Sequence, residues 1–270
     1  MHLECRVIDL HYHLLPGIDD GSTDLDMSLA MARMSVDDGV SCAACTPHIY
    51  PGLYENDATG IRTAISALQG ELDRHGIPLR LVQGADVHLQ PALVEGVRAG
   101  RIPTLAGTRY LLLEPPHHVA PPRFDQSLFE LTLAGLVPVI THPERLSWIE
   151  DHYEAFERAV EAGVWMQVTA GSLTGRFGRR PRYWAERMLD EGLVHLLATD
   201  AHDLRRRPPL LGEGRDAAAL RVGAEEADRL VVMRPQAIID DLAPDQVPAP
   251  IRASAVRSRR PGFLKSLFGA

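Results

Sequence analysis

Histidines and carboxylates recur along the chain in short polar clusters. Nine of them stand out: His11, His13, Asp20, His48, Asp86, Glu114, His142, Asp200 and His202. Imidazole nitrogens and carboxylate oxygens are together suitable ligands for divalent Mn, Fe or Zn. In a strand, His11 and His13 project to the same side, so they can bind one ion together. A single residue of this kind is usually a hydrogen-bonded core side chain, but nine that converge on one face predict a metal centre.

Two arginines accompany these clusters. Arg145 follows His142 by three residues, and Arg207 follows the Asp200–His202 pair. Guanidinium groups bind phosphate oxygens through paired hydrogen bonds, so both arginines indicate an anionic substrate. The alternative for each is a salt bridge to a neighbouring carboxylate. Arg205 and Arg206, by contrast, are expected to be solvated surface residues.

Cysteine and lysine contribute little to the predicted chemistry. Cys42 and Cys45 fall inside a predicted strand, where their side chains point to opposite faces, so we expect buried thiols rather than a zinc or disulfide pair. No cysteine is followed at the sixth position by arginine, as a Cys-x5-Arg phosphate loop requires. The sequence has one lysine, Lys265, and it lies in the predicted tail, which disfavours Schiff-base and Walker A chemistry.

The polar clusters follow short apolar segments that are typical of strands, at 6–10, 40–45, 79–84, 110–113, 137–141, 165–168 and 194–198. Helical periodicity fills most of the intervals, at 24–38, 58–75, 91–99, 124–134, 149–162, 182–191 and about 212–241. About seven successive βα units predict a parallel sheet with helices outside it. At this length a closed or distorted TIM-like barrel is favoured, and its active site lies at the carboxyl ends of the strands.

Composition bounds the class of protein. The chain of 270 residues is 45% apolar and 24% charged with a net charge of −8, which describes an ordinary folded protein and disfavours general nucleic-acid binding. No apolar run is long enough for stable membrane insertion, so we expect a cytoplasmic protein. We predict one domain over residues 1–243 and a flexible Pro/Ala-rich, basic tail over 244–270. Apolar residues at 263–268 offer an alternative, a short membrane or partner contact.

In order, these motifs resemble those of the polymerase-and-histidinol-phosphatase (PHP) superfamily. They look most like its CpsB/CapC branch, the manganese-dependent bacterial protein-tyrosine phosphatases of capsule and exopolysaccharide operons. The matching stretches are His11–His13, Asp19–Gly21, Thr46–His48, Gly84–Asp86, Glu114, His142–Arg145, Gln167–Ser172 and Thr199–His202. The resemblance spans roughly residues 7–210 and implies a distorted (β/α)7 barrel, the PHP fold.

The resemblance also implies a centre of three Mn²⁺ ions, with Fe, Zn, Mg or Co as substitutes. One ion would be held by His11, His13, Asp86 and Asp200; a second by Asp86 and Glu114 with His48 and His142; a third would be completed by Asp20 and His202. Arg145 matches the family's catalytic arginine and Arg207 a second phosphate contact, while His202 is a candidate general acid. The family usually has Glu in place of Asp86, so this shorter carboxylate is expected to bridge less well. Only spacing from His13 favours Asp20 over Asp19.

The implied activity is phosphotyrosine hydrolysis, in which a metal-bridged hydroxide attacks phosphorus without a cysteine nucleophile. The implied substrate is the phosphotyrosine tail of a membrane tyrosine autokinase that controls capsule or exopolysaccharide synthesis and export. Such a partner would bring the protein to the inner face of the membrane, and an oligomer is compatible with this role. The alternatives are another PHP phosphoesterase, such as a histidinol-phosphate phosphatase or a small-phosphoester hydrolase, and a non-catalytic phosphotyrosine-binding module.

Overall fold

Short parallel strands alternate with helices in the computed structural model, which describes residues 7–254. The strands are β1 (Ile8–Tyr12), β2 (Cys42–Cys45), β3 (His48–Ile49), β4 (Arg80–Gln83), β5 (Asp86–His88), β6 (Tyr110–Glu114), β7 (Val137–Thr141), β8 (Trp165–Thr169) and β9 (Leu196–Ala198). The helices are α1 (Leu25–Asp37), α2 (Ala58–Arg74), α3 (Leu93–Arg98), α4 (Phe124–Leu133), α5 (Tyr153–Glu161), α6 (Ala170–Leu173), α7 (Arg179–Asp190), α8 (Gly212–Val222), α9 (Ala224–Asp228) and α10 (Arg234–Ile239).

The strands form a distorted barrel. One sheet has the order β1-β2-β4 and the other β3-β5-β6-β7-β8-β9. β2 continues into β3 after Thr46-Pro47, and β4 continues into β5 after Gly84-Ala85, so each pair is one strand with a kink. A parallel bridge between Tyr12 and Ala201 joins the chain after β9 to β1. Counting each kinked strand once, seven parallel strands succeed one another among the described residues, as the sequence predicts.

An irregularity in β1 decides where its histidines point. From Asp9 to Tyr12 the strand takes three steps while its partner β2 takes two, so β1 contains a bulge. Before the bulge, Leu10 packs in the barrel interior. After it, His11 and His13 also face inward, with their Nε2 atoms 3.1 Å apart. Because of the bulge, one strand contributes Leu10 to the apolar interior and two histidines to the carboxyl end of the barrel.

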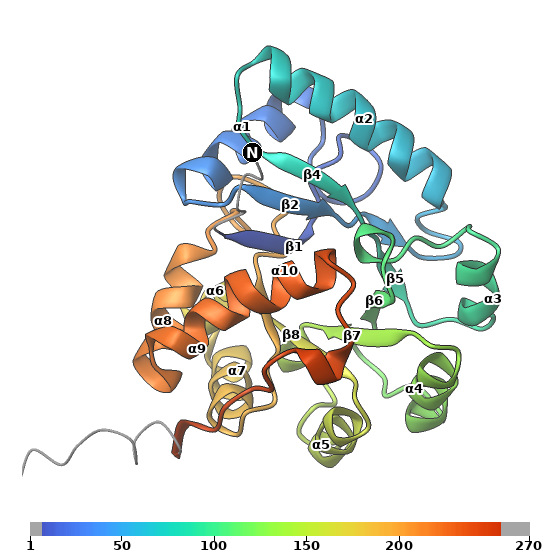
Figure 1. Ribbon diagram of the computed structural model, residues 1–270, viewed down its shortest axis with the longest axis vertical. Coiled ribbons are helices and arrows are strands. Elements are labelled where there is room, and N and C mark those ends of the chain that lie inside the picture. Colours follow the sequence, from blue (N-terminus) through green and yellow to red (C-terminus); the bar gives the residue numbers. More distant parts are fainter. Residues whose placement is uncertain (1–6, 255–270) are drawn as a thin grey trace, which may run out of the picture.

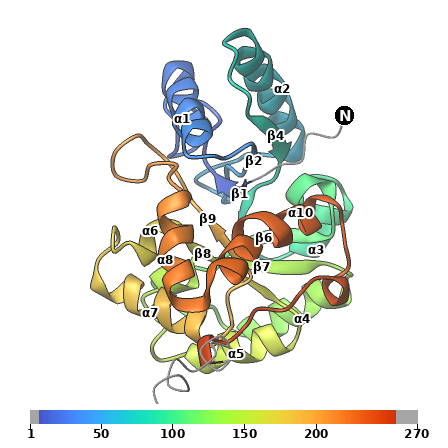
Figure 2. The same ribbon diagram turned by 60° about the vertical axis from the view of Figure 1, so that its left-hand side comes forward.

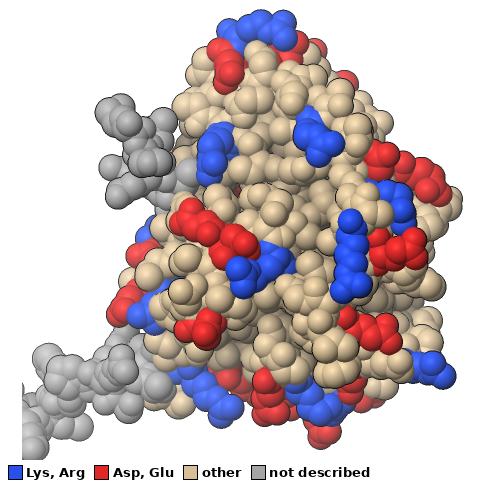
Figure 3. Space-filling view, turned by 45° about the vertical axis from the view of Figure 1, so that its right-hand side comes forward, with Lys and Arg blue, Asp and Glu red and all other residues tan. Residues whose placement is uncertain are grey.

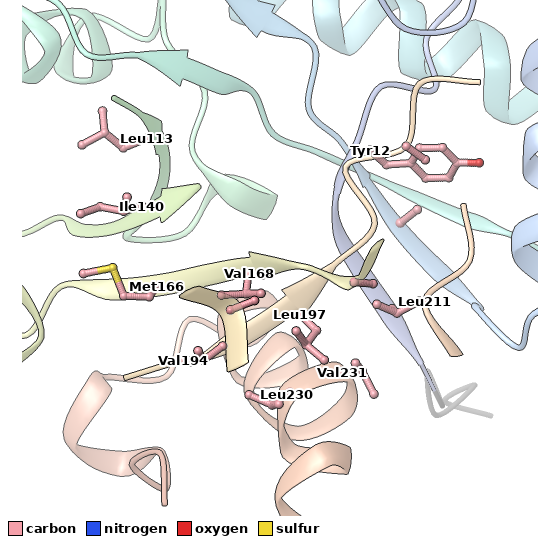
Figure 4. Packing of buried hydrophobic residues seen from close by; sticks show 14 of the residues in the cluster. Tyr12, Leu113, Ile140, Met166, Val168, Val194, Leu197, Leu211, Leu230 and Val231 are labelled. Atoms are coloured by element: carbon pink, nitrogen blue, oxygen red, sulfur yellow. The ribbon is translucent and has the colours of Figure 1, made fainter. Parts of the chain in front are cut away.

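The barrel has an apolar interior and an apolar outer layer. Leu10, Leu112, Val139 and Leu196 fill the interior, which α10 covers at the amino ends of the strands with Ile238 (Figure 1). The outer layer packs strands against helices, and Figure 4 shows part of it around β8, β9 and the segment η3 (Arg229–Met233). Figure 2 shows α1 and α2 beside β1, β2 and β4, with the remaining helices around the other strands.

The two cysteines of the strand β2 behave as the sequence predicts. Cys42 lies in the interior cluster and Cys45 in the outer one, so their side chains are on opposite faces, and both are buried. Burial raises the pKa of the Cys45 thiol well above its usual range. A neutral, inaccessible thiol is no nucleophile.

Local signals explain where the helices α1 and α2 begin. The carboxylate of Asp24 accepts a hydrogen bond from the backbone N–H of Met27 and caps α1. Asp57 caps α2 in the same way through Gly60. The helical region predicted over 212–241 breaks between α8 and α9, where Gly223 takes a φ of +84°, and then continues through α9, η3 and α10.

The chain after α10 stays packed on the body for as far as the structure describes it. The sequence predicts a flexible segment from Pro244, but Pro244–Gln246 form a 3-10 turn and Val247 and Ala253 are buried. The buried guanidinium of Arg234 donates hydrogen bonds to the carbonyls of Pro248 and Ala249. Residues 255–270, including the apolar 263–268, lie outside the described residues.

The described helices do not include a membrane span. Within residues 7–254, every helix is too short or too polar to cross a bilayer. On the face drawn in Figure 3, acidic and basic side chains are interspersed rather than gathered into a field of one sign.

Candidate metal centre

All nine predicted ligands lie at the carboxyl ends of the strands. Their sources are β1 (His11, with His13 one residue beyond it), the β1–α1 loop (Asp20), β3 (His48), β5 (Asp86), β6 (Glu114), the chain after β7 (His142) and the chain after β9 (Asp200, His202). We call this set the candidate metal centre. Parallel strands deliver their carboxyl ends to one face of a barrel, and residues far apart in sequence meet there for that reason.

The candidate ligand atoms fall into overlapping groups. In each group the atoms lie within 4.8 Å of one another; the groups are His11/His13/Asp86, His11/His142/Asp200, His48/Asp86/Glu114, Glu114/His117/His142 and His13/Asp20/His48/His202. Asp86 and Glu114 each belong to two groups. Shared carboxylates are what a centre with more than one ion requires.

The most informative residue is Asp86. Its side chain is fully buried, and neither carboxylate oxygen has a hydrogen-bond partner among the described residues. The nearest nitrogens are Nε2 of His11, 3.4 Å from Oδ2, and Nδ1 of His48, 3.5 Å from the same oxygen. Such burial is costly for a carboxylate unless a cation meets it. Nδ1 of His142 and Nε2 of His202 are unpartnered in the same way, so the donor set fits divalent metal ions.

Two further polar residues fix the orientation of the β1 histidines. Gln167 Oε1 lies 2.9 Å from Nδ1 of His11, and Asp19 Oδ2 lies 2.7 Å from Nδ1 of His13. Each contact leaves Nε2 turned toward the centre. Partners of this kind set the tautomer and raise the basicity of a ligating imidazole.

Asp19 and Asp20 therefore occupy different places. Asp19 is nearly inaccessible, and it also accepts hydrogen bonds from the backbone of Gly21 and His48. Asp20 is half-exposed and directs Oδ1 to within 3.4 Å of Nε2 in both His48 and His202. Of the two carboxylates, only that of Asp20 lies against His48 and His202 of the candidate metal centre, and its role as a ligand stays a prediction.

Carboxylates favour positive charge at two positions of the centre, His11 and His48. Burial alone lowers the pKa of His11, but Asp200 and Asp86 outweigh it and raise the pKa to about 9. Burial opposes the charged form of His48 as well, yet Asp20 and Glu114 raise its pKa to about 12. These protons mark positions where the carboxylates stabilise a cation, and metal binding would displace them.

Both predicted arginines reach the same carboxylate. Nη1 of Arg145 and Nη2 of Arg207 donate to Oδ2 of Asp200, so each makes the salt bridge that was the alternative to a substrate contact. Both side chains nevertheless line a hollow of about 440 Å³ together with His48 and Glu114. The guanidinium of Arg145 also lies over the ring of Phe177, 4.6 Å from its centroid. Arg205 and Arg206 are exposed, as predicted.

Two histidines near Glu114 were not predicted. Nε2 of His117 lies 3.1 Å from Oε1 of Glu114, and Nδ1 of His88 lies 3.8 Å from Oε2. The sequence contains a signal for His88, because this residue follows Asp86 by two positions, the same spacing as in the His11–His13 pair. His117 lies in a loop, where spacing carries no such information.

The arrangement of fold and site defines an α/β barrel protein with a candidate metal centre of His and carboxylate side chains at the carboxyl ends of its strands. A family model described as "Capsular polysaccharide synthesis, CpsB/CapC" matches residues 7–240. The chain belongs to this CpsB/CapC family.

Individual relatives agree with this assignment. The chain is 34% identical over 201 residues to the tyrosine-protein phosphatase YwqE of Bacillus subtilis (strain 168), covering 74% of this chain and 79% of the relative. It is 28% identical to the putative tyrosine-protein phosphatase CapC of Staphylococcus aureus, over 82% and 87% of the two chains. A crystal structure from work on YwqE and Streptococcus pneumoniae CpsB, described as unique metal-dependent tyrosine phosphatases, superimposes with a TM-score of 0.84 at 30% identity, covering 91% of this chain and 99% of that one.

Proposed function

We propose that this protein is a metal-dependent tyrosine phosphatase. The observation that carries the proposal is the buried, unpartnered carboxylate of Asp86 among the imidazoles of His11, His13 and His48, next to a hollow lined by two arginines. The names of the relatives supply the substrate, phosphotyrosine. The buried cysteines support a mechanism without a thiol nucleophile.

We further propose that the nine residues of the candidate metal centre are ligands of three Mn²⁺ ions. The overlap of the groups at Asp86 and Glu114 supports a shared arrangement, including a bridging role for the shorter Asp86. When bound, divalent ions at such a centre supply positive charge to the phosphoryl oxygens and acidify a water molecule. Because Nε2 of His202 is buried and lies in one of the ligand groups, it is better suited to ligation than to donating a proton.

In this proposal the arginines bind and orient the phosphoryl group. Arg145 and Arg207 approach the hollow from one side and share Asp200, which holds their guanidiniums in place before substrate arrives. Their positive charge is directed at the equatorial oxygens of the phosphoryl group, where negative charge must be stabilised during phosphoryl transfer. Phe177 limits the movement of Arg145 from the other face.

The physiological partner we propose is the phosphotyrosine tail of a membrane tyrosine autokinase in capsule or exopolysaccharide synthesis. Support comes from the description of the family, which refers to capsular polysaccharide synthesis. This partner would place the protein in the cytoplasm, at the inner face of the membrane. The family match over residues 7–240 supports a single domain, and the segment packed on the body after α10 extends that domain beyond residue 243.

The test is turnover of a phosphotyrosine peptide by the purified full chain after chelation and after return of Mn, Fe, Zn, Mg or Co. We expect loss of activity on chelation and recovery with manganese. His142→Ala and Arg145→Ala should each lower kcat/KM at least about 100-fold while circular dichroism stays unchanged, because charge stabilisation is lost. Full activity in stripped protein, or in either variant, contradicts the proposal.

The same assay separates the alternatives. Faster turnover of histidinol phosphate than of the peptide would identify another phosphoesterase of the same fold. Peptide binding without phosphate release at saturating manganese would identify a binding module.

A further inference from the structure

The side chains that line the 440 Å³ hollow are buried and polar at its floor and exposed and apolar at its rim. At the floor, His142 and Glu114 are only 1% and 6% exposed. At the rim, Leu53 and Val119 are 62% and 69% exposed. A ligand that brings an anionic group to the floor can therefore contact these apolar side chains with its remaining part. We call Leu53 and Val119 the apolar rim.

Exposed apolar side chains are concentrated at this hollow. Ten large ones are exposed among residues 7–254, and three of them, Tyr50, Leu53 and Val119, line it. Single exposed apolar residues are ordinary on a protein surface. Three around one charged centre, from the separate β3–α2 and β6–α4 loops, indicate a place for an apolar group.

The β3–α2 side of the rim is preorganised. The backbones of Tyr50 and Tyr54 pair through two hydrogen bonds of 3.0 and 2.8 Å, and Gly52 makes the turn with a φ of +83°. The ring of Tyr50 stacks on His88 at 3.9 Å, and the ring of Tyr54 stacks on His48 at 5.6 Å. Because both rings are already engaged, Leu53 projects from a turn that has little freedom to lose when a ligand binds.

We infer that the apolar rim binds the aromatic ring of the substrate and selects aryl over alkyl phosphate esters. This inference rests on the proposed phosphatase function and adds the residues that set its specificity. A tyrosyl group places a planar apolar ring between phosphate and backbone, which matches an apolar rim above a charged floor. A seryl group has one methylene there, so it leaves the rim uncovered and brings polar backbone against it. Contacts of this kind discriminate substrates by about 10- to 200-fold.

The experiment measures ring preference without requiring turnover. Calorimetry gives the dissociation constants of phenylphosphonate and methylphosphonate for the full chain supplied with Mn²⁺. We expect the wild type to bind phenylphosphonate at least about tenfold more tightly. The Leu53→Ala/Val119→Ala double variant should reduce this ratio to about threefold or less and leave methylphosphonate binding unchanged. Leu220→Ala, on α8 and 89% exposed away from the hollow, is the matched control and should behave as wild type.

Equal affinity of the wild type for the two phosphonates, or an unchanged ratio in the double variant, overturns the inference. A parallel assay with phosphotyrosine and phosphoserine peptides of one sequence keeps the two proposals apart. If neither peptide is hydrolysed, the proposed function fails, while the phosphonate ratio still decides the role of the rim.

Discussion

Adjacent residues at the candidate metal centre have different surroundings, and Asp19 and Asp20 show this most clearly. Asp19 contacts Nδ1 of His13 from behind, and Asp20 faces His48 and His202. In the sequence both are turn-forming acids before a glycine. Their difference arises from backbone hydrogen bonds to Gly21 and His48, which fix one carboxylate inside the loop.

Asp19→Asn should weaken manganese binding about 10- to 100-fold, because a neutral amide makes the His13 imidazole less basic and fixes its tautomer less well. Calorimetric titration of the stripped protein measures this, and excess manganese should restore phosphatase activity. Asp24→Asn is the control: it lies in the same loop but caps α1, where Asn serves equally well. Wild-type metal affinity in Asp19→Asn would show that the carboxylate has no such role.

At the scale of elements, the strands were predictable and their irregularities were not. Apolar β-rich runs locate each strand, and polar residues mark the carboxyl ends. The bulge in β1 and the kinks between β2 and β3 and between β4 and β5 depend on contacts between neighbours. At the second kink, for example, a Cβ on Gly84 would lie 2.9 Å from Thr46 Cγ2. Such a close approach involves residues that are distant in sequence, so no local sequence pattern predicts it.

Two helical glycines should respond oppositely to substitution by alanine. In α8, a Cβ on Gly214 would lie 2.5 Å from Cβ of Ala170 and 2.7 Å from its Cα, so Gly214→Ala should lower the free energy of unfolding by about 1–3 kcal/mol. In α2, a Cβ on Gly70 meets nothing within 4 Å, so Gly70→Ala should raise it by about 0.5–1 kcal/mol. Denaturant unfolding of both variants tests the pair, and shifts of the same sign would contradict the packing described.

At the scale of the whole molecule, the sequence predicts the barrel and the candidate site together because both follow from one repeated pattern, an apolar strand that ends in a histidine or a carboxylate. What the sequence misses depends on tertiary contacts. His117 becomes a neighbour of Glu114 through the path of its loop, and the segment after Pro244 is held by Arg234, whose partners lie 14 and 15 residues away. Neither contact follows from periodicity or spacing.

Stability should fall in mild acid partly because of His195. Burial, with the charge of Arg234, lowers its pKa to about 3, so the folded protein keeps this imidazole neutral. The unfolded chain takes up the proton near pH 6.5; the stabilising contribution is therefore present above that pH and is lost as pH falls toward 3. Between pH 7.5 and 5, the free energy of unfolding of wild type should drop about 2 kcal/mol more than that of His195→Asn. The amide oxygen of Asn can replace Nδ1 as the acceptor from Met166 N–H. If the free energies of unfolding of wild type and His195→Asn fall in parallel with pH, the neutral imidazole of His195 makes no such contribution to stability.

The packed segment after α10 also decides where the described chain leaves the body. Arg252 lies against Gly192, in the turn before β9, and hence at the amino ends of the strands. The hollow opens at the opposite ends. A fluorophore or a sensor surface coupled after Ser254 would thus be attached on the far side of the molecule from the entrance, and the tethered enzyme would keep that entrance open to a large phosphoprotein.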